Sequence, residues 1–398
     1  MANQRTKRTL PPLRRADMTY NTDLYSARNR ETKPRTIAIG SPDYIILICV
    51  ILLVMFGIIM VFSSSYYTSG RGDGDIYEYL KKELLYASIG FVAMFIGTKI
   101  PHKNWARFAK LAYIVSCILL VIVIIAGKEV GGAKRWIEIG PLSFQPSEIA
   151  KISVILALST IINNNPRLLD TWEGVGKYAI TFAIPCGLVA VENLSTAIVI
   201  GAISCAILFV VTPKLQYFLP VIGAGILGVV GMIMFSGFRS DRFAAWLDPF
   251  SVSSDTGYQI VQSLYSIASG GMFGLGLGGS RQKLGYMPEA HNDIIFAIIC
   301  EELGWFGAAI IVTIFMVLIW RGVLVAVKHS DNYYSMLMAT GITTMIAVQV
   351  IINIAVVTNS IPNTGIPLPF ISYGGTSMII LLFSMGVLMN ISKYKKIQ

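Results

Sequence analysis

"DIIFAIICEELGWFGAAIIVTIFMVLIW", residues 293–320, is a long apolar run that begins with one acidic residue and contains two more. A helix that crosses a bilayer needs about 20 mostly apolar residues, so this run is long enough to span a membrane. Ionisable groups inside a span are costly, and by default they are functional or paired. The stretch therefore predicts a membrane protein that places carboxylates at the edge of, and within, a spanning helix.

The rest of the chain has the same apolar character. Its 398 residues are 54% hydrophobic and 14% charged, and the mean hydropathy is +0.65. Such values exclude an ordinary soluble domain. The candidate spans are 44–66, 84–100, 108–127, 147–163, 176–191, 194–212, 217–237, 293–320, 333–357 and 377–391. We predict an all-α polytopic membrane protein with about ten transmembrane helices.

Charged residues indicate the orientation and the domain limits. Residues 1–42 have no apolar core, and the first 40 hold nine Lys or Arg against three acids, so we expect a disordered, basic cytoplasmic tail rather than a signal peptide. Residues 43–392 would form the membrane domain, with a large extracellular loop at 238–292, and 393–398 a cytoplasmic C-terminus. With both termini inside, inner segments carry roughly twice as many Lys and Arg as outer loops, in line with the positive-inside rule.

Several common functions lack their sequence signals. The net charge of +10 forms no basic patch with interleaved aromatics, so nucleic-acid binding is not indicated. All five cysteines lie in apolar runs without CxxC or Cys/His spacing, so neither a zinc site nor a disulfide framework is predicted. "GLGLGG", residues 274–279, does not follow a strand of a βαβ unit, and it indicates a tight turn near Arg281 and Lys283 rather than a dinucleotide site.

The acids and the histidine around the opening stretch have alternative interpretations. Asp293 would lie near the water interface, where it could meet a polar substrate, or it could cap the following helix. His291 is a candidate substrate contact, as a neighbour that tunes Asp293, or it is an exposed loop residue. Glu301 and Glu302 would be buried, and pairing with a lysine or with backbone is the favoured explanation.

Cations beside aromatic residues occur in two predicted outer loops. Lys134 and Arg135 stand in "GGAKRWI", and Arg239 and Arg242 in "FRSDRFAAWLDPF". Such groups either anchor the chain at the membrane surface or bind phosphate oxygens. Because their outer location runs against the charge rule, anion binding is a hypothesis of equal weight.

Two further segments are candidates for a substrate site. In "QPSEIAK", residues 145–151, Glu148 and Lys151 share one helix face and can pair, which either locks the bundle or serves the chemistry. "IPNTGIPLPFISYGGTS", residues 361–377, is uncharged and holds three prolines. Non-helical backbone near a membrane must be buried or line a cavity. We expect a substrate-groove wall with Ser372 as a candidate contact, or a structural plug.

Together these segments resemble the SEDS family (shape, elongation, division and sporulation) over about residues 44–391. The motifs are "GAKRWIEIGPLSFQPSEIAK", "DRFAAWLDPF", "GYQIVQSLYSIASGGMFGLGLGGSRQKLGYMPEAHNDIIFAIICEELG" and "NTGIPLPFISYGGTS". The stretch ending in the last motif is closer to the division branch, FtsW, than to RodA. One departure is "ENLSTA", residues 192–197, where many members have "PDLGTA", so the role of that acid is in doubt at Asn193.

The resemblance implies a peptidoglycan glycosyltransferase that polymerises lipid II at the outer face of the cytoplasmic membrane. The family's essential aspartate corresponds to Asp293, which would act as general base. The leaving pyrophosphate would need the four cations named above or a divalent ion, Mg²⁺ or Mn²⁺. Implied partners are a class B penicillin-binding protein and division regulators at the septum. The alternatives are a lipid II flippase, a RodA- or SpoVE-type role in elongation or sporulation, and a purely structural scaffold.

Overall fold

The computed structural model describes residues 37–69, 75–130, 133–139, 142–212, 215–234, 237–250 and 255–396. The chain divides into two units, residues 1–40 with 394–398, and residues 41–393. In the smaller unit β1 (Ile37–Ile39) pairs antiparallel with β5 (Tyr394–Lys396). Because segments from both ends of the chain pair directly, both belong on one side of a membrane, as an even number of spans requires. Most of the predicted tail, residues 1–36, lies outside the described residues.

The larger unit is built from long helices, ten of which fall within the described residues. They are α2 (Tyr44–Ser69), α3 (Glu78–Lys99), α4 (His102–Ala126), α5 (Pro146–Asn164), α6 (Trp172–Glu192), α7 (Leu194–Val211), α8 (Leu215–Met234), α11 (Ile295–Lys328), α12 (Tyr333–Val357) and α13 (Thr376–Ser392). Seven of these, α2, α4, α5, α6, α7, α11 and α12, are long and apolar enough to cross a membrane. The ten correspond in order to the ten predicted runs, and the predicted polytopic helical class is confirmed.

Three predicted helices need larger boundary corrections. The predicted second and third spans begin at residues 84 and 108, but α3 begins at Glu78 and α4 at His102, because their charged first turns are helical although they are not apolar. The eighth was expected at 293–320, but α11 starts after Asp293 and continues to Lys328. It is also not one continuous helix, since Gly304 has φ 66° and breaks it.

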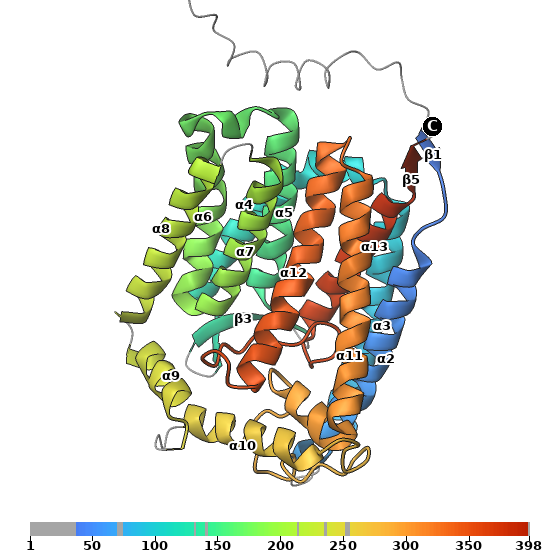
Figure 1. Cartoon of the computed structure of the whole chain (residues 1–398), viewed down its shortest axis with the longest axis vertical. Helices are drawn as coiled ribbons and strands as arrows, with labels where there is room; N and C mark the ends of the chain where they lie inside the picture. Colours follow the sequence, from blue (N-terminus) through green and yellow to red (C-terminus); the bar gives the residue numbers. More distant parts are fainter. Residues whose placement is uncertain are drawn as a thin grey trace, which may run out of the picture. The chain divides into compact units, whose positions relative to one another are not determined.

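Successive long helices run up and down, and most connecting structure gathers at one end of the bundle (Figure 1). We call this the loop end. It carries a small sheet, the helices α9 (Gly237–Leu247) and α10 (Asp255–Gly270), and the loops 271–294 and 358–375. The predicted loop 238–292 is therefore partly helical.

The sheet was not predicted. Strands β2 (Lys128–Val130), β3 (Ala133–Ile139) and β4 (Leu142–Phe144) form an antiparallel sheet in the order β2-β3-β4. These strands are short and lie between two apolar runs, so they carry none of the apolar signal that predicts a span. The sheet sets the direction of Lys134 and Arg135 at the loop end.

Close packing of small residues fixes α13 and hence the loop before it. A Cβ atom on Gly386 would stand 2.1 Å from the Met94 carbonyl oxygen of α3. A Cβ on Gly57 of α2 would meet the Phe370 carbonyl oxygen at 2.4 Å. Small residues let helix backbones approach where lipid gives no hydrophobic drive for association. Loop 358–375 is thereby pressed against α2 and held beside the turn that carries Asp293.

Candidate active site

Asp293 lies in the turn that leads into α11. Glu289 has the left-handed φ of 53°, and the Asn292 amide donates to the Glu289 carbonyl at 2.9 Å, which forms the turn. The residue directly before α11 is Ile294, and no side chain caps its first turn. The capping interpretation of Asp293 is therefore wrong, because the acid lies one residue too early.

Two residues of neighbouring segments fix the position of Asp293. The buried Asn353 of α12 donates its amide to the Asp293 carbonyl at 2.6 Å and to the Ile366 carbonyl at 2.8 Å. The Asp293 Oδ2 atom lies 3.5 Å from the position of a Cβ on Gly365, whose φ is 66°. The uncharged loop 358–375 therefore forms a wall against the carboxylate, and glycine leaves room there.

The electrostatic surroundings suit a base at neutral pH. Part of Asp293 stays accessible, yet enough protein surrounds it that burial raises the pKa of its carboxyl from 3.8 to about 6. The charge of Glu289 acts in the same direction, whereas Arg242 and Arg135 oppose it. Such a carboxylate is ionised at pH 7 and accepts a proton more readily than an exposed aspartate.

The arginines reach this site from different elements. Arg242 of α9 donates from Nη1 to the Asn363 carbonyl at 3.3 Å, and Arg135 of β3 donates from Nε to the Glu192 carbonyl at 3.0 Å. The amide of Lys134 donates to the Glu192 carboxylate at 2.8 Å. The side chain of Arg239 lies outside the described residues. Asn193, where the family pattern has an acid, caps α7 by accepting from the Thr196 amide at 3.1 Å.

A hollow lies beside Lys134 and Arg135. Its polar lining also includes Gln145, Ser147, Glu192 and Asn193, and its apolar lining comes from the last turns of α4 and α6 (Leu120, Val123, Leu188 and Val189). The buried Ser147 hydroxyl has no hydrogen-bond partner among the described residues. The hollow therefore has a mixed lining of two cations, the Glu192 carboxylate, neutral polar groups and apolar side chains.

The histidine prediction needs correction. His291 is 4% exposed rather than a loop surface residue, because its ring packs against Tyr79 and Tyr373 at centroid distances of 4.3 and 5.7 Å. The Tyr373 amide donates to the His291 carbonyl at 3.0 Å. Burial lowers the pKa of His291 to about 4, so the ring is neutral at pH 7. Ser372 is also buried, and its hydroxyl accepts from the Leu368 amide at 2.8 Å.

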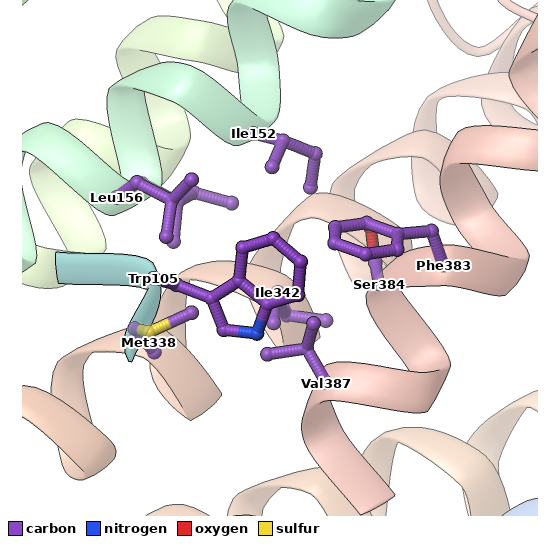
Figure 2. A pocket seen from close by; sticks show the side chains of 9 residues that line it. Trp105, Ile152, Leu156, Met338, Ile342, Phe383, Ser384 and Val387 are labelled. Carbon is purple, nitrogen blue, oxygen red and sulfur yellow. The ribbon is translucent and has the colours of Figure 1, made fainter. Parts of the chain in front are cut away.

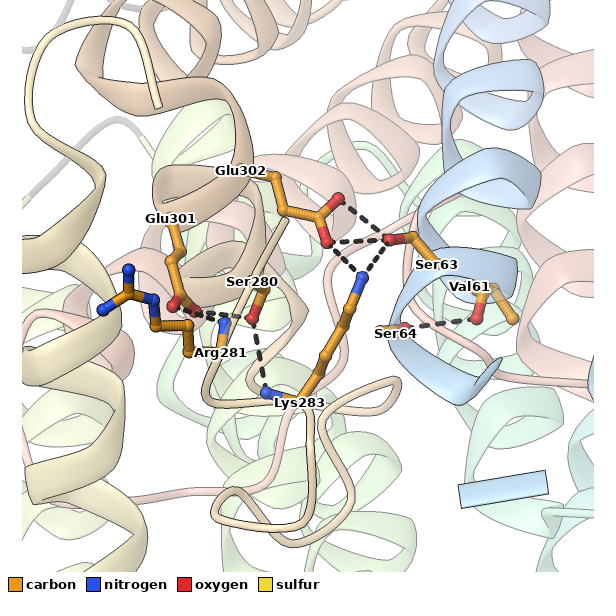
Figure 3. Close-up of polar contacts among 8 residues, drawn as sticks. All are labelled: Val61, Ser63, Ser64, Ser280, Arg281, Lys283, Glu301 and Glu302. Atoms are coloured by element: carbon orange, nitrogen blue, oxygen red, sulfur yellow. Dashed lines mark hydrogen bonds and ion pairs between the residues drawn. The ribbon is translucent and has the colours of Figure 1, made fainter. Parts of the chain in front are cut away.

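The remaining predicted residues form two buried clusters. Glu148 and Lys151 pair at 2.8 Å within α5, and Ser377 of α13 donates to Glu148 at 3.0 Å. Glu301 accepts from the Ser280 hydroxyl at 2.6 Å and the Arg281 amide at 2.9 Å. Glu302 pairs with Lys283 at 2.7 Å (Figure 3). The four charged helix residues, Glu148, Lys151, Glu301 and Glu302, were predicted from the sequence. Four neighbours of the site were not: Ser63, Tyr79, Asn353 and Gly365.

The arrangement of the helices has counterparts among solved structures. One chain of the structure entitled "Structural coordination of polymerization and crosslinking by a peptidoglycan synthase complex" superposes with a TM-score of 0.73 at 23% identity, covering 88% of this chain and 97% of that chain. The rod shape determining protein RodA of Thermus thermophilus gives a TM-score of 0.65 at 23% identity, over 88% and 96%. These similarities define the class by its fold, a RodA-like helical membrane protein.

Sequence comparison identifies the family. The FTSW_RODA_SPOVE model, "Cell cycle protein", matches residues 43–397. Stage V sporulation protein E of Bacillus subtilis (strain 168) is 38% identical over 360 residues, 89% of this chain and 98% of that protein. "Probable peptidoglycan glycosyltransferase FtsW" of the same organism is 38% identical over 370 residues, 89% and 92%. The chain belongs to the FTSW_RODA_SPOVE family, and two of the family's branches match it with equal identity.

Proposed function

We propose that this protein is a peptidoglycan glycosyltransferase that polymerises lipid II into glycan strands, with Asp293 as its general base. The observation that carries the proposal is the partly accessible Asp293 carboxylate, whose pKa burial raises to about 6, within the electrostatic reach of Arg135 and Arg242. The names of relatives at 38% identity and of the solved synthase complex support the reaction class. The loop end would face the outer side of the cytoplasmic membrane.

The reaction divides between the carboxylate and the cations. Asp293 removes the proton of the acceptor sugar's 4-hydroxyl as that oxygen bonds to the donor's anomeric carbon. The bond from this carbon to the lipid pyrophosphate breaks, and the electron pair leaves with the pyrophosphate. Attack from the face opposite an α-linked leaving group gives a β-linkage. Proton transfer of this kind typically contributes about 10²–10⁴-fold to the rate.

Lys134 and Arg135 are the proposed partners of the leaving pyrophosphate. They lie beside the Glu192 carboxylate and the apolar ends of α4 and α6, next to which the polyprenyl chain would lie. Arginine forks match phosphate oxygens, and charge that develops in the transition state is stabilised by cations already in place. Among the described residues no three His, Cys, Asp or Glu side chains gather into a metal site.

A lipid II flippase is the competing function, and the structure favours it less. A flippase needs a polar path for the sugar headgroup through the bundle. The buried charges of α5 and α11 are already paired or hydrogen bonded. A hollow inside the bundle, between α4, α5, α12 and α13, is lined almost wholly by apolar side chains such as Trp105, Leu156 and Phe383 (Figure 2).

The proposed cellular role is septal synthesis during division. "VVTNSIPNTGIPLPFISYGGTS", residues 356–377, supports the division branch, whereas the equal match to a sporulation protein supports the alternative. A class B penicillin-binding protein and division regulators are the proposed partners, because the solved relative belongs to a complex that combines polymerisation and crosslinking. Coexpression with a division-type transpeptidase should raise activity more than coexpression with an elongation-type or sporulation-type one.

The deciding experiment is lipid II polymerisation by the purified protein with a cognate transpeptidase, with glycan ladders resolved on a gel. Wild type should give ladders and Asp293→Ala should not. Ladders of normal length from Asp293→Ala would refute its role as base. An absence of ladders from wild type, together with lipid II crossing the bilayer of liposomes, would establish the flippase instead.

A further inference from the structure

At the break in α11, the backbone groups that lack helical partners bond to a preceding loop of the chain. At Gly304 the helical hydrogen bonds are interrupted, and the glycine-rich segment 270–276 lies against the gap. Four backbone bonds of 2.9–3.1 Å join the two: Leu275 N to Glu301 O, Gly276 N to Glu302 O, Trp305 N to Gly271 O, and Phe306 N to Met272 O. A Cβ on Gly274 would stand 2.2 Å from the Glu302 carbonyl oxygen, so this approach requires glycine.

A buried ion pair between side chains also connects this loop to α11. Lys283 donates from Nζ to Glu302 Oε1 at 2.7 Å and to Ser63 Oγ of α2 at 2.9 Å, and the Ser63 hydroxyl donates to Glu302 at 2.8 Å (Figure 3). Lys283 is 6% exposed and Glu302 0%, so the pair is removed from water. It therefore joins three separate segments: α2, loop 271–294 and the first part of α11.

Asp293 lies in the segment between Lys283 and Glu302, whose two ends are joined by this ion pair. It follows Lys283 by ten residues and precedes Glu302 by nine. Between them Met287, Ala290 and Ile294 are buried, so the segment is packed as well as tied at both ends. A displacement of either end would move the carboxylate relative to the wall at Gly365.

We propose that Lys283 and Glu302, anchored on Ser63, are positioning residues that hold Asp293 in its catalytic place. This inference rests on the proposed function, because it assigns the pair a task in that reaction. A buried ion pair is a weak source of net stability, since desolvation offsets its attraction. It does specify which groups meet, and catalysis is sensitive to placement: a 1 Å displacement can cost on the order of 10²-fold in rate.

The test uses the full-length protein and four variants: Lys283→Met, Glu302→Gln, the double variant Lys283→Met/Glu302→Gln, and Lys283→Arg. Each single neutral variant leaves one buried charge unpaired and should lower polymerisation on the order of 10²-fold. The double variant has no unpaired charge and should recover much of the stability that the single variants lose, yet polymerise poorly. Lys283→Arg keeps the charge and should retain most activity. Glu78→Gln/Lys82→Met removes an exposed pair of α3 and serves as the matched control.

Two readouts separate positioning from simple loss of folded protein. The pH midpoint of polymerisation should move from near 6 toward the ordinary aspartate range in the double variant, because a displaced Asp293 is less buried. Amide hydrogen exchange over residues 285–297, which needs no activity, should become faster there but not in the control. An unchanged midpoint and unchanged exchange would overturn the proposal. If wild type makes no polymer, the proposed function fails, and the exchange comparison still decides whether the pair holds this segment.

Discussion

Asp293 and Glu302 are carboxylates nine residues apart on the same part of the chain, and the protein treats them in opposite ways. Asp293 keeps an accessible surface, and burial raises its pKa to about 6 although the charges of Arg242 and Arg135 act in the opposite direction. Glu302 is fully buried, with Lys283 at 2.7 Å and Ser63 at 2.8 Å. The contrast fits the proposed roles: the carboxylate proposed to exchange protons is accessible, whereas the one proposed to hold segments together is buried with its partners.

The largest expected effect is on catalysis at Asp293. Asp293→Asn keeps the shape of the side chain but removes the base, so polymerisation should fall about 10²–10⁴-fold. Initial rates of lipid II consumption measure the loss. Glu289→Gln, four residues earlier, is the control, because it removes a nearby exposed acid, and it should leave the rate within a few-fold. An equal loss of rate in both variants would show that Asp293 has no special role among the acids of this turn.

The second effect is on folding at Glu302. Glu302→Gln leaves Lys283 buried without its counter-charge, which typically costs about 3–5 kcal/mol. Thermal unfolding in detergent should show a large decrease in Tm. The double variant Lys283→Met/Glu302→Gln should recover much of it, because no lone charge remains. A single variant as stable as wild type would show that the pair is not sealed from water.

The third effect is on stability at Asp293, where removal of the charge should stabilise the protein rather than destabilise it as at Glu302. Its folded pKa, about 6, is above the unfolded value, so the group favours the folded state below about pH 4, and this contribution is lost as pH rises through 6. Asp293→Asn should therefore be more stable than wild type at pH 8, by up to about 3 kcal/mol. The difference should vanish near pH 4. Unfolding curves at both pH values measure it, and a variant less stable at pH 8 would contradict the assignment.

The smallest expected effect concerns Asn353. Asn353→Ala removes two hydrogen bonds that tie Asp293 to Ile366, worth about 1 kcal/mol each. We expect polymerisation to fall about tenfold, with KM little changed. Gln349→Ala, one turn earlier on α12 and also buried, tests whether any polar loss on this helix has the same result. A similar decrease in both would assign Asn353 to the bundle rather than to the site.

The helices followed from the sequence more readily than the site did. Apolar runs of 15 residues or more predicted every long helix, because membrane spans need little beyond hydrophobicity. The strands within residues 128–144 were not predicted, because short strands at a membrane surface have no long apolar run. The break at Gly304 was not predicted either, because glycine within an apolar run is common in spanning helices.

Within the site, local pairs were predictable and distant ones were not. Glu148 and Lys151 are three residues apart on one helix, so the spacing alone predicts their contact. Lys283 and Glu302 are separated by a turn and by the start of a helix, and no periodicity relates them. Asp293 was singled out by its place at the edge of a span, but its role came from the family resemblance. Its burial and the contacts of Asn353 depend on tertiary packing.

The break at Gly304 also decides where the bilayer begins. Unbroken, the 34 residues of α11 would measure about 51 Å, far more than a hydrocarbon core of about 30 Å. The part after the break, 305–328, is about 36 Å long and already spans that thickness. It opens with Trp305 and Phe306, 60% and 62% exposed, the residue types that form aromatic belts at headgroup level. By this reasoning Glu301 and Glu302, which are buried in the protein, lie at headgroup depth rather than at mid-membrane depth, and the chemistry proposed for Asp293 would take place above the lipid tails.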